Sequence, residues 1–137
     1  MSPDSNNTQT VKDLYAAFGR ADLAAILALV ADDVDWRNDR VESRECPWNG
    51  DFSGKAKLPG FFQTLAEHLE FPVFDVKAVF GSGAMVAAVI DIEGKVKRTG
   101  RSFRNEAVHI WTFNANGKVA KYRHHNDTAS ERDAWRG

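Results

Sequence analysis

The chain has 137 residues, of which 43% are hydrophobic and 27% are charged, and its formal net charge is -1. This length and composition predict one globular domain over residues 1–137, large enough to bury a continuous core without disulfides or metal ions. The nearly balanced charge gives no electrostatic reason to expect nucleic acid or an anionic membrane as a partner.

The single cysteine, Cys46, excludes an internal disulfide and any multi-cysteine metal site, and its polar surroundings predict an ordinary loop thiol. The first ten residues contain no basic start and no apolar run, which predicts a chain without a signal peptide. No apolar run approaches the ~18 residues of a membrane-spanning helix. We therefore expect a cytoplasmic protein in which residues 1–9 form a disordered tail.

Two short helices are expected first. Apolar residues at helical spacing predict a helix over residues 11–18, which Gly19 ends, and a second helix over residues 23–30, which Asp22 caps. Residues 34–38 alternate between apolar and polar side chains, which predicts a short strand.

A long loop over residues 39–54 is expected to precede a third helix over residues 55–70, with Pro59 in its first turn. A loop of this length inside a compact domain is usually functional or a partner surface. Trp48 and Phe52 lie near its tip, and we expect these side chains to close over the rest of the domain.

The rest of the chain predicts strands. Residues 73–80 alternate, and residues 84–93 form a near-continuous apolar run that is typical of a central strand and ends in a turn at Gly94. Two long strands then fold back on each other across residues 114–117, because an Asn-Gly pair between two alternating runs favours a hairpin.

Helices followed by such strands indicate an α+β domain, in which a cone-shaped, curved antiparallel sheet wraps around the N-terminal helices. The open end of a cone is a preferred place for a small-molecule site. Every second residue of the first hairpin strand lies on one face, which is aromatic and apolar except for His109 and Asn105. A face that only fills a core would not need these polar side chains, so it predicts the wall of a pocket.

A resemblance to a known family is carried by three segments: VKDLYAAFGRADLAAILALVADDVDW at 11–36, FFQTLAEH at 61–68 and RSFRNEAVHIWTFNANGKVAKYRHHNDTA at 101–129. They resemble the nuclear transport factor 2-like superfamily, and within it the branch of SnoaL-like polyketide cyclases and ketosteroid isomerases. The resemblance implies a cone-shaped α+β barrel, a deep pocket between helices and sheet, a homodimer packed through the sheet, and no cofactor. It does not choose a reaction, because this scaffold carries isomerases, cyclases, epoxide hydrolases and non-catalytic binders.

The resemblance also implies roles for single residues. SnoaL-like cyclases use an aspartate near the end of the last strand as general acid/base, and Asp127 falls at that place. Steroid isomerases keep a carboxylate where this chain has Asn38, an acid where it has His109 and a tyrosine where it has Leu14, so their chemistry lacks its groups here.

Epoxide hydrolases of this scaffold use two aspartates and an arginine. Asp91 matches one aspartate, but the arginine falls on Val89 and the other aspartate on His124, so this set is incomplete.

Two residues are the catalytic candidates. Asp127 is expected to be the general acid/base if aromatic neighbours raise its pKa toward neutrality; the alternative is a carboxylate that caps a helix before Thr128. His109, between Ala107 and Trp111 on the pocket face, is expected to be neutral and to polarise a substrate oxygen. Its alternative is a histidine that only holds the barrel together.

Further residues are expected to line the pocket: Tyr15, Trp36, Asn38, Phe62, Asp91, Asn105, Trp111 and Arg123. Alternation places Arg123, His125 and Asp127 on one face of the last strand and His124 and Asn126 on the other, and a bulge would exchange the two sets. His124 and His125 point to opposite faces, so no metal site is expected, since a metal needs several convergent ligands.

Two functions of different classes stay open. The first is cofactor-independent proton transfer, of the isomerase or cyclase type, on a hydrophobic carbonyl compound. The second is a non-catalytic ligand-binding or dimeric scaffold protein, and an epoxide hydrolase is a weaker alternative. In each case the expected partner is a small hydrophobic or aromatic molecule.

Overall fold

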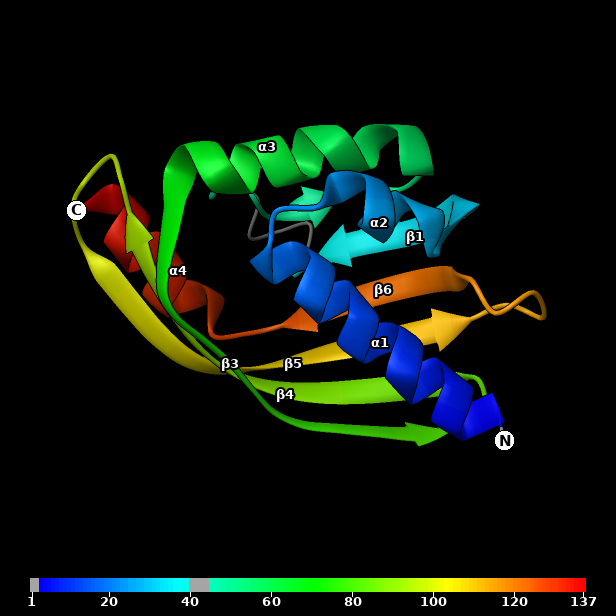
Figure 1. Ribbon diagram of the computed structural model, residues 1–137. Coiled ribbons are helices and arrows are strands. Elements are labelled where there is room, and N and C mark those ends of the chain that lie inside the picture. Colours follow the sequence, from blue (N-terminus) through cyan, green and yellow to red (C-terminus); the bar gives the residue numbers. More distant parts are fainter. Residues whose placement is uncertain (1–2, 40–44) are drawn as a thin grey trace.

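The computed structural model describes residues 3–39 and 45–137. The helices and strands in these ranges appear in Figure 1 and are, in chain order, α1 (Pro3–Gly19), α2 (Leu23–Ala28), β1 (Val30–Asn38), β2 (Gly50–Asp51), the 3-10 helix η2 (Lys55–Lys57), α3 (Leu58–His68), β3 (Leu69–Ser82), β4 (Met85–Val96), β5 (Ser102–Phe113), β6 (Val119–His125) and α4 (Thr128–Arg136).

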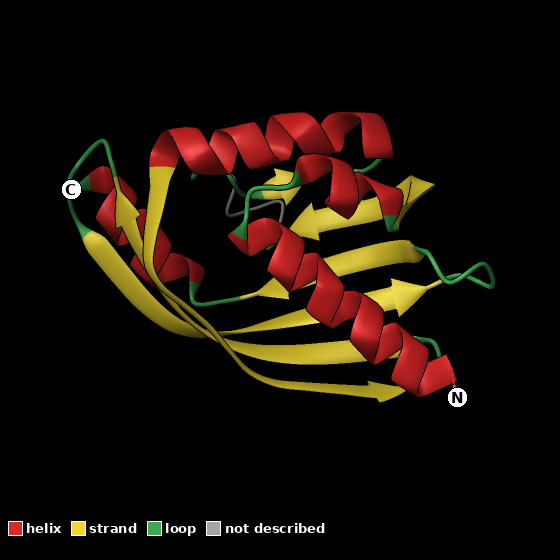
Figure 2. Cartoon of the chain, viewed as in Figure 1, coloured by secondary structure: helices red, strands yellow, loops and turns green. Residues whose placement is uncertain are grey.

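The strands form one curved sheet in the order β2-β1-β6-β5-β4-β3. Figure 2 shows the helices α1, α2 and α3 on the concave side of this sheet, and α4 at its strongly curled end. The predicted α+β class and the cone-shaped sheet wrapped around N-terminal helices are confirmed. The curled end of the sheet rises to the C-terminal end of α3, from which β3 continues directly.

The sheet is mixed rather than antiparallel throughout. β1 runs parallel to β6, with Trp36 opposite Tyr122 and Asn38 opposite His124, whereas the other neighbouring strands are antiparallel. The expected antiparallel sheet is therefore corrected at this one pair. Alternation within β1 shows that it is a strand, but its direction in the sheet depends on the distant edge that it joins.

The long hairpin is confirmed. β5 and β6 pair antiparallel, with His109 opposite His124 and Trp111 opposite Tyr122. In the turn, the Asn114 side chain accepts hydrogen bonds from the backbone N–H of Asn116 and Lys118, and Gly117 has a φ of 74°, which a residue without a Cβ adopts at little cost.

The helices differ from prediction at their ends. α1 begins at Pro3, so the expectation of a disordered tail is wrong from that residue onward, while residues 1–2 lie outside the described part. The second helix ends at Ala28 and Val30 already belongs to β1. The helix α4 enters the sequence analysis only as the helix that Asp127 would cap in the alternative interpretation of that residue, and the structure contains it. Within residues 3–39 and 45–137, no helix combines the length and the apolar character needed to cross a membrane.

Gly94 was expected to begin a turn, but it lies inside β4, which continues to Val96. It pairs with Phe103 of β5, whose ring covers the glycine Cα. A Cβ at residue 94 would lie 2.8 Å from Cε1 of that ring and closer still to Cζ. The glycine is therefore required because the aromatic ring occupies the place of a side chain.

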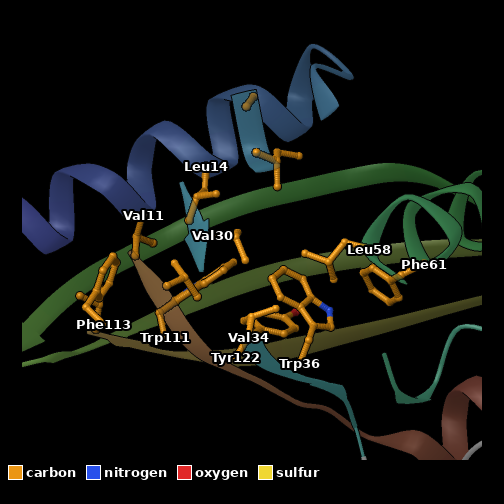
Figure 3. Close-up of a cluster of buried hydrophobic side chains, with 14 residues drawn as sticks. Val11, Leu14, Val30, Val34, Trp36, Leu58, Phe61, Trp111, Phe113 and Tyr122 are labelled. Atoms are coloured by element: carbon orange, nitrogen blue, oxygen red, sulfur yellow. The ribbon is translucent and has the colours of Figure 1, made fainter. Parts of the chain in front are cut away.

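The main core joins α1 to the middle of the sheet. Figure 3 shows Val11 and Leu14 of α1 above Trp111 of β5, and Trp36 of β1 beside Tyr122 of β6. The rings of Trp36 and Tyr122 are stacked, with centroids 4.1 Å apart. Large aromatic side chains on neighbouring strands thus form the floor on which the helices rest.

Gly94→Ala is expected to lower the free energy of unfolding by about 1–3 kcal/mol, because the new methyl group overlaps the buried Phe103 ring and forces it out of its place. Urea unfolding followed by circular dichroism measures this change. Gly60→Ala is the matched control: it lies in α3 with nothing within 4 Å of a new Cβ, and alanine is preferred there. Equal stability of Gly94→Ala and wild type would show that the Phe103 ring moves freely.

Candidate active site

A cavity lies between the helices and the concave face of the sheet, with a volume of about 720 Å³ including the part open to solvent. Most of its lining side chains are aromatic or aliphatic. The polar ones are Asn38, His109, His124, Asn126 and Glu131. An apolar pocket with a few convergent polar groups is the usual form of a small-molecule site.

The structure places most of the residues predicted from the sequence at this cavity. The residues of that set that line it are Tyr15, Trp36, Asn38, Phe62, His109 and Trp111. They come from α1, β1, α3 and β5, so the cavity is built by elements from both halves of the chain.

A hydrogen-bonded group of three side chains occupies the middle of the cavity wall. The Tyr15 hydroxyl lies 2.8 Å from His109 Nδ1 and accepts a hydrogen bond from Trp111 Nε1 at 3.1 Å. Because the indole can only donate, the hydroxyl proton is available for His109 Nδ1, and the imidazole then carries its own proton on Nε2. Burial, and next the charges of His124 and His125, lower the pKa of His109 well below its usual value, so it is neutral.

His109 therefore has one nitrogen already bonded to Tyr15. It lines the cavity and also ties α1 to β5, whereas its expected role in polarising a substrate oxygen stays a prediction. Burial also raises the pKa of Tyr15, so this phenol stays protonated and keeps its hydrogen-bond donor.

Asp127 does not line the cavity. It is exposed and precedes α4 as its N-cap, where its side chain accepts hydrogen bonds from the N–H of Ala129 and Ser130. The expectation that Asp127 is the buried acid/base group is corrected to the alternative reading, a helix cap. A carboxylate on a short side chain just after the strand accepts hydrogen bonds from the free N–H groups at the start of the next helix and does not extend to the cavity.

Asn105 lies on the inner face of β5, but its side chain is hydrogen-bonded to the start of α4. Its side-chain amide donates to Ser130 Oγ at 3.0 Å and also lies 3.4 Å from the Asp127 carbonyl oxygen. The expectation that it lines the pocket is corrected: it anchors the start of α4 to β5.

Asp91 and Arg123 lie on the outer face of the sheet, so neither lines the pocket as expected. Asp91 forms an ion pair with Arg104 at 2.8 Å, and Arg123 forms one with Asp35 at 2.8 Å. Along each strand these residues alternate with buried neighbours that face the cavity. On the outer face of the sheet, each of the two side chains meets a residue of opposite charge. The placement of Asp91 also removes the remaining carboxylate of the epoxide hydrolase alternative.

The last strand turns His124 inward. A register shift between β5 and β6 leaves Ala120 without a partner, since Thr112 pairs with Lys121 and Phe113 with Val119. Beyond this bulge Tyr122 and His124 face the cavity, and His125 faces solvent. This answers the question that alternation left open.

His124 forms a buried pair with Asp39. Its Nδ1 lies 2.9 Å from Asp39 Oδ2, and the two side chains are 8% and 2% exposed. Asp39 follows β1 with a φ of 59°, a left-handed conformation that few non-glycine residues adopt. Backbone strain of this kind marks positions that the surrounding structure holds in place, often at functional sites.

The electrostatics of this pair favour an acid/base role. Burial by itself would lower the pKa of His124, but the charge and hydrogen bond of Asp39, together with the charge of Glu131, outweigh it and raise the pKa above its usual value. With Nδ1 bound to Asp39, Nε2 is the reactive nitrogen, and it finds no hydrogen-bond partner among the described residues.

Glu131 of α4 is the buried carboxyl group at this end of the cavity, 2% exposed. Its Oε2 accepts a hydrogen bond from Trp48 Nε1 at 2.8 Å, and its Oε1 accepts one from Asn49 Nδ2 at 3.2 Å. Burial raises the pKa of Glu131 to about 7, and the charge of Asp39 adds to this rise, whereas His124 and the two hydrogen bonds oppose it. Such a carboxyl is poised to give or take a proton near neutral pH.

The loop before β2 closes this end of the cavity. Trp48 is buried as expected and stacks on the Phe103 ring at 6.5 Å, and Phe52 packs against Phe61 at 4.9 Å. Asn38 Nδ2 donates to the Trp48 carbonyl and to Asn49 Oδ1, both at 3.1 Å. Residues 40–44 of the expected loop lie outside the described part.

Cys46 belongs to the same loop and is buried rather than exposed. Burial, followed by the charge of Glu131, raises the pKa of its thiol to about 12, so it stays protonated and unreactive. Among the residues that the structure describes, no three histidine, cysteine or carboxylate side chains converge as a metal site would require.

Sequence reasoning missed Asp39 and Glu131. Asp39 is one of several acidic residues around β1, and nothing in its neighbours distinguishes it. Glu131 follows Asp127 by one helical turn, and together with Ala134 it forms the buried face of α4. An aspartate cap followed by that buried stripe is the signal that could have revealed both the helix and the carboxyl group.

The family of the chain follows from comparison with known proteins. The SnoaL-like domain family matches residues 11–122, and the chain belongs to this family. No curated protein is matched significantly by the sequence.

Solved structures share the fold over nearly the whole chain. An NTF2-like protein from Burkholderia xenovorans LB400 is 31% identical over 96% of both chains, with a TM-score of 0.86. An NTF2-like protein of unknown function from Burkholderia pseudomallei K96243 is 30% identical over 98% of both chains, with a TM-score of 0.84. A proposed polyketide cyclase from Pseudomonas putida KT2440 is 21% identical over 93% of this chain and 96% of its own, with a TM-score of 0.74, which shows the fold alone.

The raised pKa of Glu131 has a consequence for stability. The native state binds a proton at Glu131 up to about pH 7, whereas the unfolded chain releases it near its ordinary value, about 4.3. The contribution of this group to the free energy of unfolding is therefore complete below about pH 4.3 and declines as the pH rises to about 7, by an amount on the order of 3 kcal/mol.

Glu131→Gln is expected to flatten this decline. Urea unfolding between about pH 5 and pH 8 should show a smaller loss of stability with rising pH in the variant than in wild type. Glu106→Gln, at an exposed position of β5, is the control and should keep the wild-type slope. Identical slopes for Glu131→Gln and wild type would mean that the carboxyl group titrates as if it were in water.

Proposed function

We propose that this SnoaL-like protein catalyses cofactor-independent proton transfer, of the isomerase or cyclase type, on a small hydrophobic carbonyl compound. The observation that carries the proposal is the buried pair of His124 and Asp39, in which His124 Nε2 has no hydrogen-bond partner among the described residues. His124 lines the same mostly aromatic cavity as Glu131, a carboxyl group with a pKa of about 7. The catalytic groups are thus His124 and Glu131, and no longer Asp127.

The roles follow from the hydrogen bonds. Asp39 is a positioning residue: it holds the imidazole by Nδ1 and favours the tautomer in which Nε2 has a free lone pair. His124 Nε2 takes the proton from the carbon beside the carbonyl group, the electron pair of that C–H bond forms the new C=C bond, and the π pair of the carbonyl group moves to its oxygen. Protonated Glu131 supplies the proton for this oxygen, so that the enol is neutral while His124 is left as an imidazolium and Glu131 as a carboxylate.

The enol can complete the reaction in two ways. Return of the proton from His124 to a different carbon gives an isomer. Attack of the enol carbon on a second carbonyl group closes a ring, and the alkoxide formed there takes the proton from His124. In both outcomes the enol O–H proton returns to Glu131 as the first carbonyl group re-forms, so both residues regain their starting protonation states. The aromatic walls, which include Tyr15, Trp36 and Phe62, would hold a flat apolar substrate and keep water out.

The second candidate is a ligand-binding protein without catalysis. It is favoured by the hydrogen bonds that already occupy Tyr15, His109 and both oxygens of Glu131. As before, the partners we propose are a small hydrophobic or aromatic ligand and a second copy of the chain on the outer face of the sheet, where Val108, Ile110 and Thr112 are half-buried.

The proposal is tested by deuterium exchange in 2-tetralone, a bicyclic ketone with acidic C–H groups, dissolved in D2O and followed by proton NMR. Wild type is expected to accelerate the exchange, and His124→Gln and Glu131→Gln to lower the enzymatic rate by about 100-fold or more, as for loss of a general acid or base. Quenching of tryptophan fluorescence reports binding in parallel, since Trp36, Trp48 and Trp111 line the cavity.

Two controls separate chemistry from folding. His125→Gln changes the neighbouring histidine on the solvent side of β6, and Asp127→Asn keeps a good helix cap. Both should retain the wild-type exchange rate. Binding of the ketone without any acceleration of exchange would favour the ligand-binding candidate, and loss of exchange in Asp127→Asn but not in His124→Gln would return the catalytic role to Asp127.

A further inference from the structure

A second hollow lies beside the cavity, and we call it the outer chamber. It has a volume of about 600 Å³ including its solvent-open part. Its walls come from the end of α1, the bend between α1 and α2, α2 itself, α3 and the start of β3, which frame one side of the molecule in Figure 1. Every residue that lines it is apolar, in contrast to the cavity, which contains all the polar groups of the candidate site.

The two spaces lie on either side of a shared wall. Six residues line both: Phe18, Ile26, Phe62, Leu65, Leu69 and Phe71. Four of them (Phe18, Phe62, Leu65 and Phe71) are only half-buried. The aromatic rings in the wall touch at their edges, with Phe18 6.2 Å from Phe62 and 6.1 Å from Phe71 between centroids.

The aromatic side chains of this shared wall can rotate at little energetic cost. Its side chains carry no polar group, so no hydrogen bond is lost when a ring rotates, and half-buried side chains change rotamer on a short timescale. Rotation of Phe18 or Phe62 would join the outer chamber to the cavity. A ligand that entered here would pass the apolar walls and reach the cavity, which His124 and Glu131 line.

The side chains that line the outer chamber offer no hydrogen-bonding group to water. A stable water in a hollow needs several hydrogen-bond partners, and side chains such as Leu23, Leu65 and Phe71 supply none. Apolar ligand surface placed there leaves water and gains contact with an apolar wall, which is favourable in proportion to the area buried.

We propose that the outer chamber binds an apolar extension of the ligand, whose carbonyl head lies in the cavity near His124 and Glu131. The ligand class is then an amphiphilic carbonyl compound, with a reactive head and a long apolar tail, rather than a compact ring system alone. This inference rests on the proposed function for the position of the head, but it concerns binding and not turnover.

A series of methyl ketones, from 2-heptanone through 2-nonanone to 2-undecanone, tests the proposal, with tryptophan fluorescence to measure each Kd. Wild type is expected to bind more tightly by about 2- to 4-fold for each added methylene group. Ala66→Phe places a ring in the outer chamber, because Ala66 lines it from α3 and is exposed. This variant is expected to bind 2-heptanone as wild type does and to lose the gain for the longer ketones.

Ala24→Phe is the matched control, since Ala24 is an exposed alanine of α2 that does not line the chamber. It should keep the full dependence on chain length, and thermal unfolding should show both variants folded. A wild-type affinity that does not change with chain length, no binding of any ketone, or an equal weakening of short and long ketones by Ala66→Phe would overturn the proposal.

The outcome is separate from that of the exchange experiment. Chain-length dependence with no acceleration of deuterium exchange would retain the outer chamber and reject the catalytic proposal. Acceleration of exchange in 2-tetralone without chain-length dependence would do the reverse.

Discussion

The polar end of the cavity depends on the buried carboxyl group of Glu131. It accepts hydrogen bonds from Trp48 and Asn49, and Asn38 in turn holds the same loop through the Trp48 carbonyl and Asn49. One side chain therefore connects α4, the loop before β2 and the end of β1. Removing one partner from a buried polar network costs several kcal/mol, about 3–5 for a charged pair, so these three segments hold their positions together.

The cavity contains two polar groups of different character. In the first, Tyr15 satisfies both His109 and Trp111, so the hydrogen bonds close on themselves and fasten α1 to β5. In the second, Asp39 occupies one nitrogen of His124 and leaves the other without a partner among the described residues. A closed group stabilises the fold, whereas an open one, with a raised pKa and a strained neighbour at Asp39, has the properties of a reactive site.

Several features were predictable because they depend on local patterns. The alternation of residues 103–113 gave the cavity face of β5, and the Asn-Gly turn gave its pairing with β6. The resemblance to SnoaL-like proteins implied the cone and the pocket. The errors at Asp91, Arg123 and Asp127 share one cause, because each charged side chain has a partner outside the pocket that the sequence pattern does not reveal. The partner is an arginine for Asp91, an aspartate for Arg123 and a helix N-terminus for Asp127.

By itself, the sequence determined that the chain forms an α+β cone with an aromatic interior, because the spacing of apolar residues decides which face of each element must leave water. Tertiary structure decided which polar groups share that interior. The unpaired Ala120 turned His124 inward, the left-handed backbone of Asp39 brought its carboxylate to the imidazole, and α4 carried Glu131 into the opening. Asp39 is far from His124 and Glu131 in sequence, and only packing brings the charges of the three groups close enough to shift one another's pKa values.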